Sequence, residues 1–264
     1  MNLDAIDRYA KSLIKEAGHK IRVSFFSHIQ IDSKSNANDL VTNIDREIEQ
    51  FFISRIQKDF PTHQVFGEEG FGDVVTSLDG VTWILDPIDG TMNFVHQKRN
   101  FAISLGIYVD GVGMLGYIYD VMQDDLYHAA KGKGAYYNDE LLPQLEAKLI
   151  TDAIIGVNAK WVVPNRALNH HKITELVLEC RGTRSYGSAA LEIAYVATGR
   201  LDAYMSTRLS PWDIAGGLVI GREVGISATN LRGEELGLLK QETFLIARPE
   251  LHEHILKHYI ELKI

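Results

Sequence analysis

The segment 86–91, with the sequence Asp-Pro-Ile-Asp-Gly-Thr, carries two carboxylates three residues apart and directly follows the apolar run 81–85. The apolar run predicts a buried strand, and the proline and glycine predict a turn at its end. Such a turn presents both carboxylates at the exit of a rigid element, where they could bind a hard cation such as Mg²⁺. The N–H groups of Gly90 and Thr91 could bind a phosphate. A plain surface turn is the alternative, because these residue types are also ordinary turn chemistry.

Three other acidic segments favour the interpretation as a cation site. They are Gly-Glu-Glu-Gly at 67–70, Pro-Trp-Asp at 211–213 and Thr-Asn-Ile-Asp at 42–45. Two of their acids have structural alternatives that the residues alone leave open. Asp45 could complete a helix capping box with the threonine three residues before it. Asp213 would occupy a first helical turn, where the helix dipole favours an acid in any case.

Taken in chain order, these segments resemble the inositol monophosphatase family of Mg²⁺-dependent, Li⁺-sensitive sugar-phosphate phosphatases. The resemblance covers nearly the whole chain. The matching segments are 39–42 with Asp45, 67–69, 83–94, 132–138, 187–190 and 211–216. The resemblance implies an αβαβα layered sandwich of the sugar-phosphatase type, usually as a homodimer. Hydrophobic periodicity alone predicts only a mixed α/β fold.

The resemblance implies a site for two Mg²⁺ ions, which can hold the attacking water and the leaving oxygen of a phosphate monoester. Glu68, Asp86 and the backbone carbonyl of Ile88 would bind the first ion. Asp86, Asp89 and Asp213 would bind the second, so that Asp86 bridges the two. A third, weaker ion would lie near Glu68.

Catalytic and phosphate-binding roles are implied in the same way. Thr91, paired with Asp45, would orient and deprotonate the attacking water beside Glu68. The N–H groups of Gly90 and Thr91 would hold phosphate oxygens. Lys34 matches a family position near the metal site, although a lysine in a polar loop is usually only solvated. The implied activity is that of a Mg²⁺-dependent phosphoric monoester hydrolase acting on a small phosphorylated metabolite.

Substrate selection is the point at which the chain departs from the family pattern. Inositol-specific members carry an acidic residue seven positions before the last metal-binding aspartate, and this chain has Ser206 there. Arg208 and Arg184 could instead meet a second phosphate, unless Arg208 is only a solvated loop residue. We expect an inositol-1-monophosphatase with broad specificity. The alternative substrates are NADP, fructose 1,6-bisphosphate and adenosine 3′,5′-bisphosphate, and the alternative of another class is a non-enzymatic binding or regulatory protein that reuses the fold.

Composition describes an ordinary globular protein of 264 residues, of which 45% are hydrophobic and 23% charged. A net charge of −8 argues against a nucleic-acid-binding surface. No apolar run approaches the roughly 18 residues of a membrane span, and the first residues lack a signal-peptide pattern. The single cysteine, Cys180, suits a reducing compartment. We therefore expect a cytoplasmic protein without a membrane or nucleic-acid partner.

Periodicity outlines the elements that would position the candidate residues. Residues 3–21 have helical spacing, and so do the residues after Thr42, which can cap a second helix. The polar segment 31–39 predicts a loop. Short strand-like runs alternate with glycine turns over 63–137, which predicts an antiparallel meander.

The chain divides into two parts on this basis. Residues 1–145 would form an α+β half that carries most metal ligands, and 146–264 an α/β half that carries Asp213. Because the ligand set needs both halves, we expect the site to lie between them, which is a common place for ligand pockets.

Overall fold

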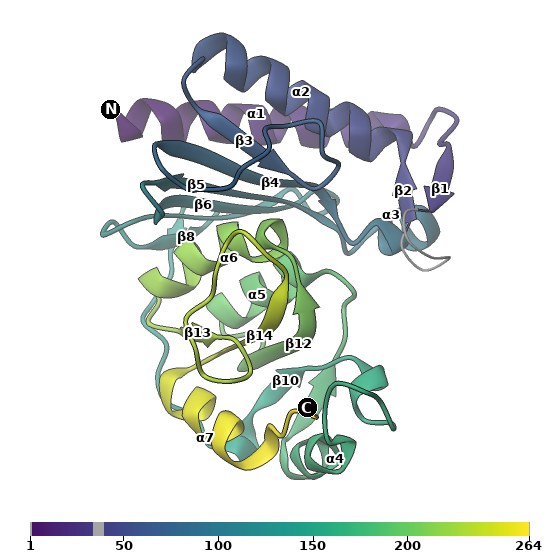
Figure 1. Cartoon of the computed structure of the whole chain (residues 1–264), viewed down its shortest axis with the longest axis vertical. Coiled ribbons are helices and arrows are strands. Elements are labelled where there is room, and N and C mark those ends of the chain that lie inside the picture. Colours follow the sequence, from purple (N-terminus) through teal and green to yellow (C-terminus); the bar gives the residue numbers. More distant parts are fainter. Residues whose placement is uncertain (1, 34–39, 264) are drawn as a thin grey trace.

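Helices and sheets stack in five layers, in the order helix, sheet, helix, sheet, helix (Figure 1). The computed structural model describes residues 2–33 and 40–263, and the predictions made for Lys34 and Asp39 lie outside these residues. Helices α1 and α2 cover the first sheet, α5 and α6 lie between the two sheets, and α4 and α7 cover the second sheet (Figure 1). The predicted αβαβα sandwich is confirmed. The α-helices are α1 (Leu3–Ser24), α2 (Asn43–Asp59), α3 (Thr91–Gln97), α4 (His170–Glu179), α5 (Ala189–Ala197), α6 (Pro211–Glu223) and α7 (Pro249–Tyr259).

The first sheet has the strand order β3-β4-β5-β6-β7-β8-β9 and is antiparallel except for the parallel pair β3–β4. The predicted meander is therefore confirmed for all but its first strand. Its strands are β3 (Gln64–Gly67), β4 (Val81–Asp89), β5 (Ala102–Val109), β6 (Val112–Asp120), β7 (Asp125–Ala130), β8 (Ala135–Tyr137) and β9 (Glu140–Leu141).

The second sheet has the order β11-β10-β12-β14-β13, in which β10 runs parallel to both of its neighbours. All of its strands follow residue 145, although the division of the chain into two domains at that residue stays a prediction. The strands are β10 (Ile154–Gly156), β11 (Gly182–Arg184), β12 (Ala203–Leu209), β13 (Ser227–Thr229) and β14 (Glu242–Ala247).

The predicted loop at 31–39 is wrong at its beginning. Residues Ile31–Ser33 form strand β1, which pairs antiparallel with β2 (Leu40–Thr42) in a separate two-stranded sheet. Its polar residues gave no strand signal because the strand is largely exposed and has no apolar face to bury.

Strand β4 carries the central motif and continues through it, which differs from the turn predicted after residue 85. The register of the ladder to β5 shifts between Asp86 and Asp89. Pro87 lies inside this irregularity, where a residue without an N–H group is tolerated. The chain turns only at Gly90, whose φ of 96° is in the left-handed region. Both carboxylates are therefore held on a rigid strand.

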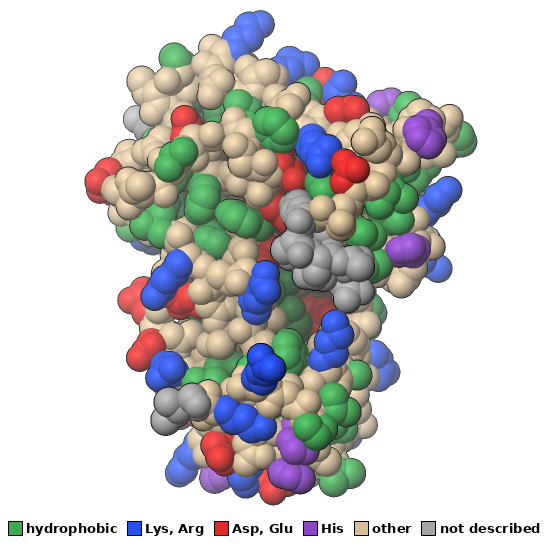
Figure 2. Space-filling view, turned by 45° about the vertical axis from the view of Figure 1, so that its right-hand side comes forward, with side chains coloured by type: hydrophobic (Ala, Val, Ile, Leu, Met, Phe, Trp, Pro, Cys, Tyr) green, Lys and Arg blue, Asp and Glu red, His purple; other side chains and the backbone are tan. Residues whose placement is uncertain are grey.

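Helix α6 lies directly on the first sheet because glycines remove the side chains between them. A Cβ at Gly116 would lie 2.3 Å from the carbonyl oxygen of Gly216, and one at Gly106 would lie 2.8 Å from Ala215. This close approach brings the N-terminus of α6, with Asp213, to the end of β4. Figure 2 shows acidic side chains inside the hollow between the upper and lower parts of the molecule, with lysine and arginine side chains over the lower part.

Candidate active site

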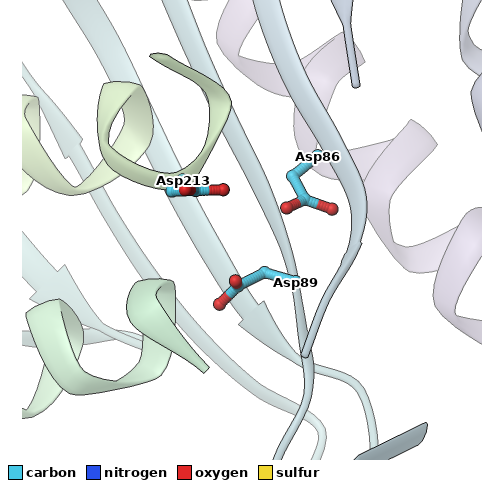
Figure 3. Close-up of side chains that lie close together, drawn as sticks. All are labelled: Asp86, Asp89 and Asp213. Atoms are coloured by element: carbon cyan, nitrogen blue, oxygen red, sulfur yellow. The ribbon is translucent and has the colours of Figure 1, made fainter. Parts of the chain in front are cut away.

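Three aspartates converge where the first sheet meets the central helices (Figure 3). Asp86 and Asp89 lie at the end of β4 and are buried, whereas Asp213 lies in the first turn of α6 and is partly exposed. Each offers one carboxylate oxygen, and these three oxygens lie within 4.8 Å of one another. Among the described residues, this is the one group of histidine, cysteine and acidic side chains with such geometry. The structure thus brings together three of the predicted ligands.

Burial and mutual repulsion raise the pKa values in this cluster. Burial, followed by the charge of Glu68, raises the pKa of Asp86 well above its ordinary value, and the other two aspartates add to the shift. Burial also raises the pKa of Asp89 to about 6, although hydrogen bonds from Ser188 and Ala190 oppose the change. A bound cation that compensates the charge of such buried carboxylates would favour their ionised form. A donor set made only of oxygens fits a hard cation such as Mg²⁺.

Glu68 reaches the centre from the turn after β3, and its side chain hydrogen-bonds that of Asp86. The turn is held by Glu49, a fully buried carboxylate on α2. Glu49 accepts the N–H groups of Glu69 and Phe71 at 2.7 and 2.9 Å. Sequence reasoning missed Glu49, because nothing in its local pattern separates it from the polar residues of an amphipathic helix. The bond from Glu69 to Glu49 is made by the backbone N–H of Glu69, so Glu69 contributes to the turn through its backbone.

Asp45 caps helix α2 and also contacts Thr91, so the cap does not exclude the predicted chemical role. Its Oδ2 accepts the N–H and the hydroxyl of Thr42 at 2.8 and 2.5 Å, which completes the capping box of α2. Its Oδ1 accepts the hydroxyl of Thr91 at 3.1 Å. The Thr91 hydroxyl also lies 3.2 Å from the carbonyl oxygen of Ile88. Burial raises the pKa of Asp45, so this carboxyl group binds a proton more readily than an exposed aspartate does.

Asp213 caps helix α6 and also belongs to the aspartate cluster. One of its carboxylate oxygens, Oδ2, accepts the N–H of Ser210 at 2.8 Å, which closes the capping box of α6. The side chain projects from the helix toward the two aspartates of β4 (Figure 3). Its place in the first turn is thus set by helix capping, and the close packing of α6 on the sheet aims it at the cluster.

Asp89 is tied to the central helix α5. Its Oδ2 accepts the hydroxyl of Ser188 at 2.5 Å and the N–H of Ala190 at 2.7 Å. Ser188 is the N-cap of α5, so the carboxylate lies at the positive end of the helix dipole. The sequence indicated the segment 187–190 only through the family resemblance and assigned it no contact with Asp89.

The candidate specificity residues do not form one group. Ser206 and Arg208 lie close together on β12, where the register to β14 shifts, and Ser206 Oγ accepts the N–H of Arg208 at 3.3 Å. Arg184 lies on β11, which is separated from β12 by β10, and its guanidinium donates to the carbonyl of Thr183 at 2.8 Å. Arg208 and Arg184 therefore lie on strands that are not neighbours in the sheet.

Arg208 lines a hollow at the end of β12 that sequence reasoning did not find. The hollow has a volume of about 520 Å³, and Trp161, Arg166 and Gln241 also line it. The amide of Gln241 donates to the hydroxyl of Ser210 at 3.1 Å, and Ser210 caps the helix that carries Asp213. The hollow thus contains two cationic side chains and contacts, through Gln241, the cap of the helix that carries Asp213.

Comparisons with known proteins agree on one family. A model of the inositol monophosphatase family matches residues 2–263. The inositol-1-monophosphatase of Bacillus subtilis (strain 168) is 52% identical over 262 residues, which cover 99% of each chain. The crystal structure of SaIMPase-II with bound inositol monophosphate is 43% identical with a TM-score of 0.87, and the match covers 97% of this chain and 93% of that one. The crystal structure of an IMPase/NADP phosphatase with Mg²⁺ and phosphate is 32% identical with a TM-score of 0.89, covering 97% and 95%. Within residues 2–33 and 40–263, no helix is long and apolar enough to cross a bilayer.

Proposed function

Because the chain belongs to the inositol monophosphatase family, a family of phosphatases, we propose that it is a Mg²⁺-dependent hydrolase of small phosphate monoesters. Its first substrate is inositol 1-monophosphate, within a broad specificity. The observation that carries the proposal is the set of three aspartate oxygens within 4.8 Å of one another at the junction of β4 and α6. The activity in the name of the Bacillus subtilis relative and the inositol monophosphate bound to SaIMPase-II support the choice of substrate.

The carboxylates divide into two overlapping ligand sets in this proposal. Glu68, Asp86 and the carbonyl of Ile88 would hold one Mg²⁺, and Asp86, Asp89 and Asp213 would hold another. A third ion would lie near Glu68. Bound Mg²⁺ supplies positive charge to the phosphate and lowers the pKa of water. Burial, together with the negative charges of Glu68, Asp89 and Asp213, raises the pKa of Asp86, and bound cations would offset both effects.

Thr91 and Asp45 act on the attacking water. The Thr91 hydroxyl donates to Asp45 Oδ1, which leaves its lone pairs free to accept a hydrogen bond from the water. Buried Asp45 has a raised pKa and can receive the proton. The N–H groups of Gly90 and Thr91, at the start of α3, hold phosphate oxygens. The attack is in line with the leaving oxygen.

We expect the purified chain to release phosphate from inositol 1-monophosphate in millimolar Mg²⁺, and Li⁺ to inhibit the reaction. The same assay uses fructose 1,6-bisphosphate, NADP and adenosine 3′,5′-bisphosphate, each with Mg²⁺, with EDTA and with Mg²⁺ plus Li⁺. Activity that persists in EDTA would exclude the metal mechanism. Absence of phosphate release from all four compounds would favour the alternative of a non-enzymatic binding protein.

A substrate with a second phosphate is the second candidate, and a specific observation favours it. Arg208 and Arg166 line one hollow that also contains Gln241, whose amide reaches the cap of the helix carrying Asp213. Guanidinium groups bind phosphate through several N–H donors at once. Ser206 offers no charge that would repel such a phosphate, unlike the acid of inositol-specific members.

Ser206→Glu should therefore shift the ratio of kcat/KM toward inositol 1-monophosphate and away from fructose 1,6-bisphosphate by roughly 10- to 100-fold. The new carboxylate would add a charged hydrogen bond to a ring hydroxyl, worth about 1.5–3 kcal/mol, and would repel the second phosphate. Arg208→Ala should lower kcat/KM for the bisphosphate selectively. Arg181→Ala is the control, because exposed Arg181 pairs with Asp152 at the surface. A ratio that moves by less than about twofold in both test variants would show that these positions do not select the substrate.

A homodimer in the cytoplasm completes the proposal. The dimer is supported by the family resemblance, and the cytoplasm by the use of a single cysteine, Cys180, which is buried and free. Light scattering after size exclusion measures the oligomeric state, and a monomeric mass at micromolar concentration would contradict the dimer.

A further inference from the structure

The turn 186–190 links the aspartate cluster to the rest of the fold. At its first residue, the amide of Asn93 donates to the carbonyl of Tyr186 at 2.7 Å. At its other end lie the hydroxyl and the N–H group that bind the carboxylate of Asp89. A displacement of this turn would therefore move both donors that orient Asp89.

Glu192, one turn into α5, holds this turn from the side of the second sheet. Its Oε1 accepts the N–H groups of Tyr186 and Gly187 at 2.8 and 3.3 Å. The residue is 4% exposed, and its other oxygen, Oε2, is buried without a hydrogen-bond partner. Burial raises the pKa of Glu192 to about 7. A buried carboxyl group with an unpartnered oxygen destabilises a fold, which indicates that the hydrogen bonds of Oε1 to the turn serve a function.

Gly156 on β10 provides the space for this side chain. A Cβ at residue 156 would lie 2.5 Å from Glu192 Oε2 and 3.0 Å from the ring of Tyr204. The second sheet thus leaves room for a glutamate of full length beside α5. An aspartate at 192 would be one methylene shorter and would leave the N–H groups of the turn without an acceptor.

We propose that Glu192 is a positioning residue of the metal site. It fixes residues 186 and 187 of the turn 186–190, and this turn orients the carboxylate of Asp89. The proposal rests on the proposed function and adds to it a residue that touches neither the metal nor the substrate. The path consists of hydrogen bonds from Glu192 to the backbone of the turn and from the turn to Asp89, and the charge of Asp89 also acts directly on Glu192. The competing explanation is that Glu192 only stabilises the N-terminus of α5.

The test measures Mg²⁺ affinity by isothermal titration calorimetry on the full chain, and Tm in EDTA. Glu192→Asp keeps the charge but is too short to reach the N–H groups of the turn. We expect it to weaken Mg²⁺ binding by about 10-fold, the lower end of the loss in affinity seen when a residue that supports a metal ligand is changed. Glu192→Gln keeps both the length and an oxygen acceptor, and we expect an affinity within about threefold of the wild type. Glu223→Ala is the matched control, because Glu223 accepts the N–H groups of Gly132 and Gly134 in another glycine turn, at 2.8 Å each. It should lower Tm and leave Mg²⁺ affinity unchanged.

Three results would overturn the proposal: unchanged affinity in Glu192→Asp, an equal loss in Glu192→Gln, or an equal loss in Glu223→Ala. The first would show that the turn does not need Glu192, the second that hydrogen bonding to the turn is not what matters, and the third that any loosened turn has the same effect. Because the readout is binding, it decides the proposal separately from catalysis. A wild-type chain that binds Mg²⁺ but hydrolyses none of the four substrates would overturn the proposed function alone.

Discussion

Asp86→Asn should reduce kcat by roughly 100-fold or more while leaving the metal-free protein at least as stable as the wild type. The amide has the shape of the carboxylate and keeps an oxygen for the N–H of Ile88, which Asp86 accepts at 2.9 Å. It removes the charge that two cations would share. It also removes a buried charge that Glu68, Asp89 and Asp213 repel. Activity and metal-free stability should therefore change in opposite directions.

Phosphate release and thermal unfolding in EDTA and in Mg²⁺ measure this prediction. The wild type should gain about 2.7 kcal/mol of stability at a Mg²⁺ concentration of 100 times Kd, and the variant much less. Asp202→Asn is the contrasting control, because buried Asp202 is paired with Arg248 and Lys148 at 3.2 and 3.1 Å. That variant should lose stability and keep both kcat and the response to Mg²⁺. An Asp86→Asn protein that is fully active, or that unfolds well below the wild type in EDTA, would contradict the prediction.

The pH dependence of stability in the absence of metal also predicts that Asp86→Asn stabilises the metal-free protein relative to the wild type. The pKa of Asp89 is raised from 3.8 to about 6, so its folded form binds a proton more tightly than the unfolded chain does. Its contribution to stability is fully present below about pH 3.8 and is lost as the pH rises through about 6. Asp86 has a shift of the same sign. The stability of Asp86→Asn relative to the wild type, both in EDTA, should therefore increase between about pH 4 and pH 7. A difference in Tm that stays constant over this range would contradict the proposed repulsion.

The local sequence pattern predicted the helices and strands that bury one face. It failed where contacts with distant parts of the chain determine the backbone conformation. The helical spacing of residues 3–21 and the cap at Thr42 fix α1 and α2, because both signals lie within a few residues. The proline of the central motif predicted a turn, but the bulge that accommodates it depends on the register to β5. No local signal reports such a register.

The sequence predicted the acidic residues of the candidate site, but it did not predict the residues that hold them in place. Asp45 and Asp213 each presented a choice between a helix cap and a chemical role, and both acids occupy the two positions at once. A carboxylate has two oxygens, so the alternatives were never exclusive. Glu49 and Glu192 bind backbone N–H groups of turns that only the folded chain brings to them. Their partners carry no side-chain signature, and sequence reasoning could not find them.

Thr91→Ala should lower kcat by about 100- to 1,000-fold while changing the Mg²⁺ activation constant by less than about threefold. Its hydroxyl contacts Asp45 and the carbonyl of Ile88. Thr91→Ser should restore most of the activity, because it returns the hydroxyl at the same place. Steady-state kinetics over a Mg²⁺ titration separate the two constants. A variant with unchanged kcat and a raised Mg²⁺ requirement would assign Thr91 to metal binding instead.

The partnership between Thr91 and Asp45 has a sharper test in a double-mutant cycle. If Thr91 acts on water through Asp45, then Asp45→Asn should lower kcat by a similar factor, and the double variant should be hardly worse than Thr91→Ala alone. Asp45→Asn also disturbs the cap of α2, and Thr42→Ala isolates that effect, because it removes the capping hydroxyl and leaves the contact between Asp45 and Thr91. Thr42→Ala should cost about 1 kcal/mol of stability and little activity. Losses in kcat that multiply in the double variant would mean that the two residues act independently, in which case the hydrogen bond of 3.1 Å between them is only a packing contact.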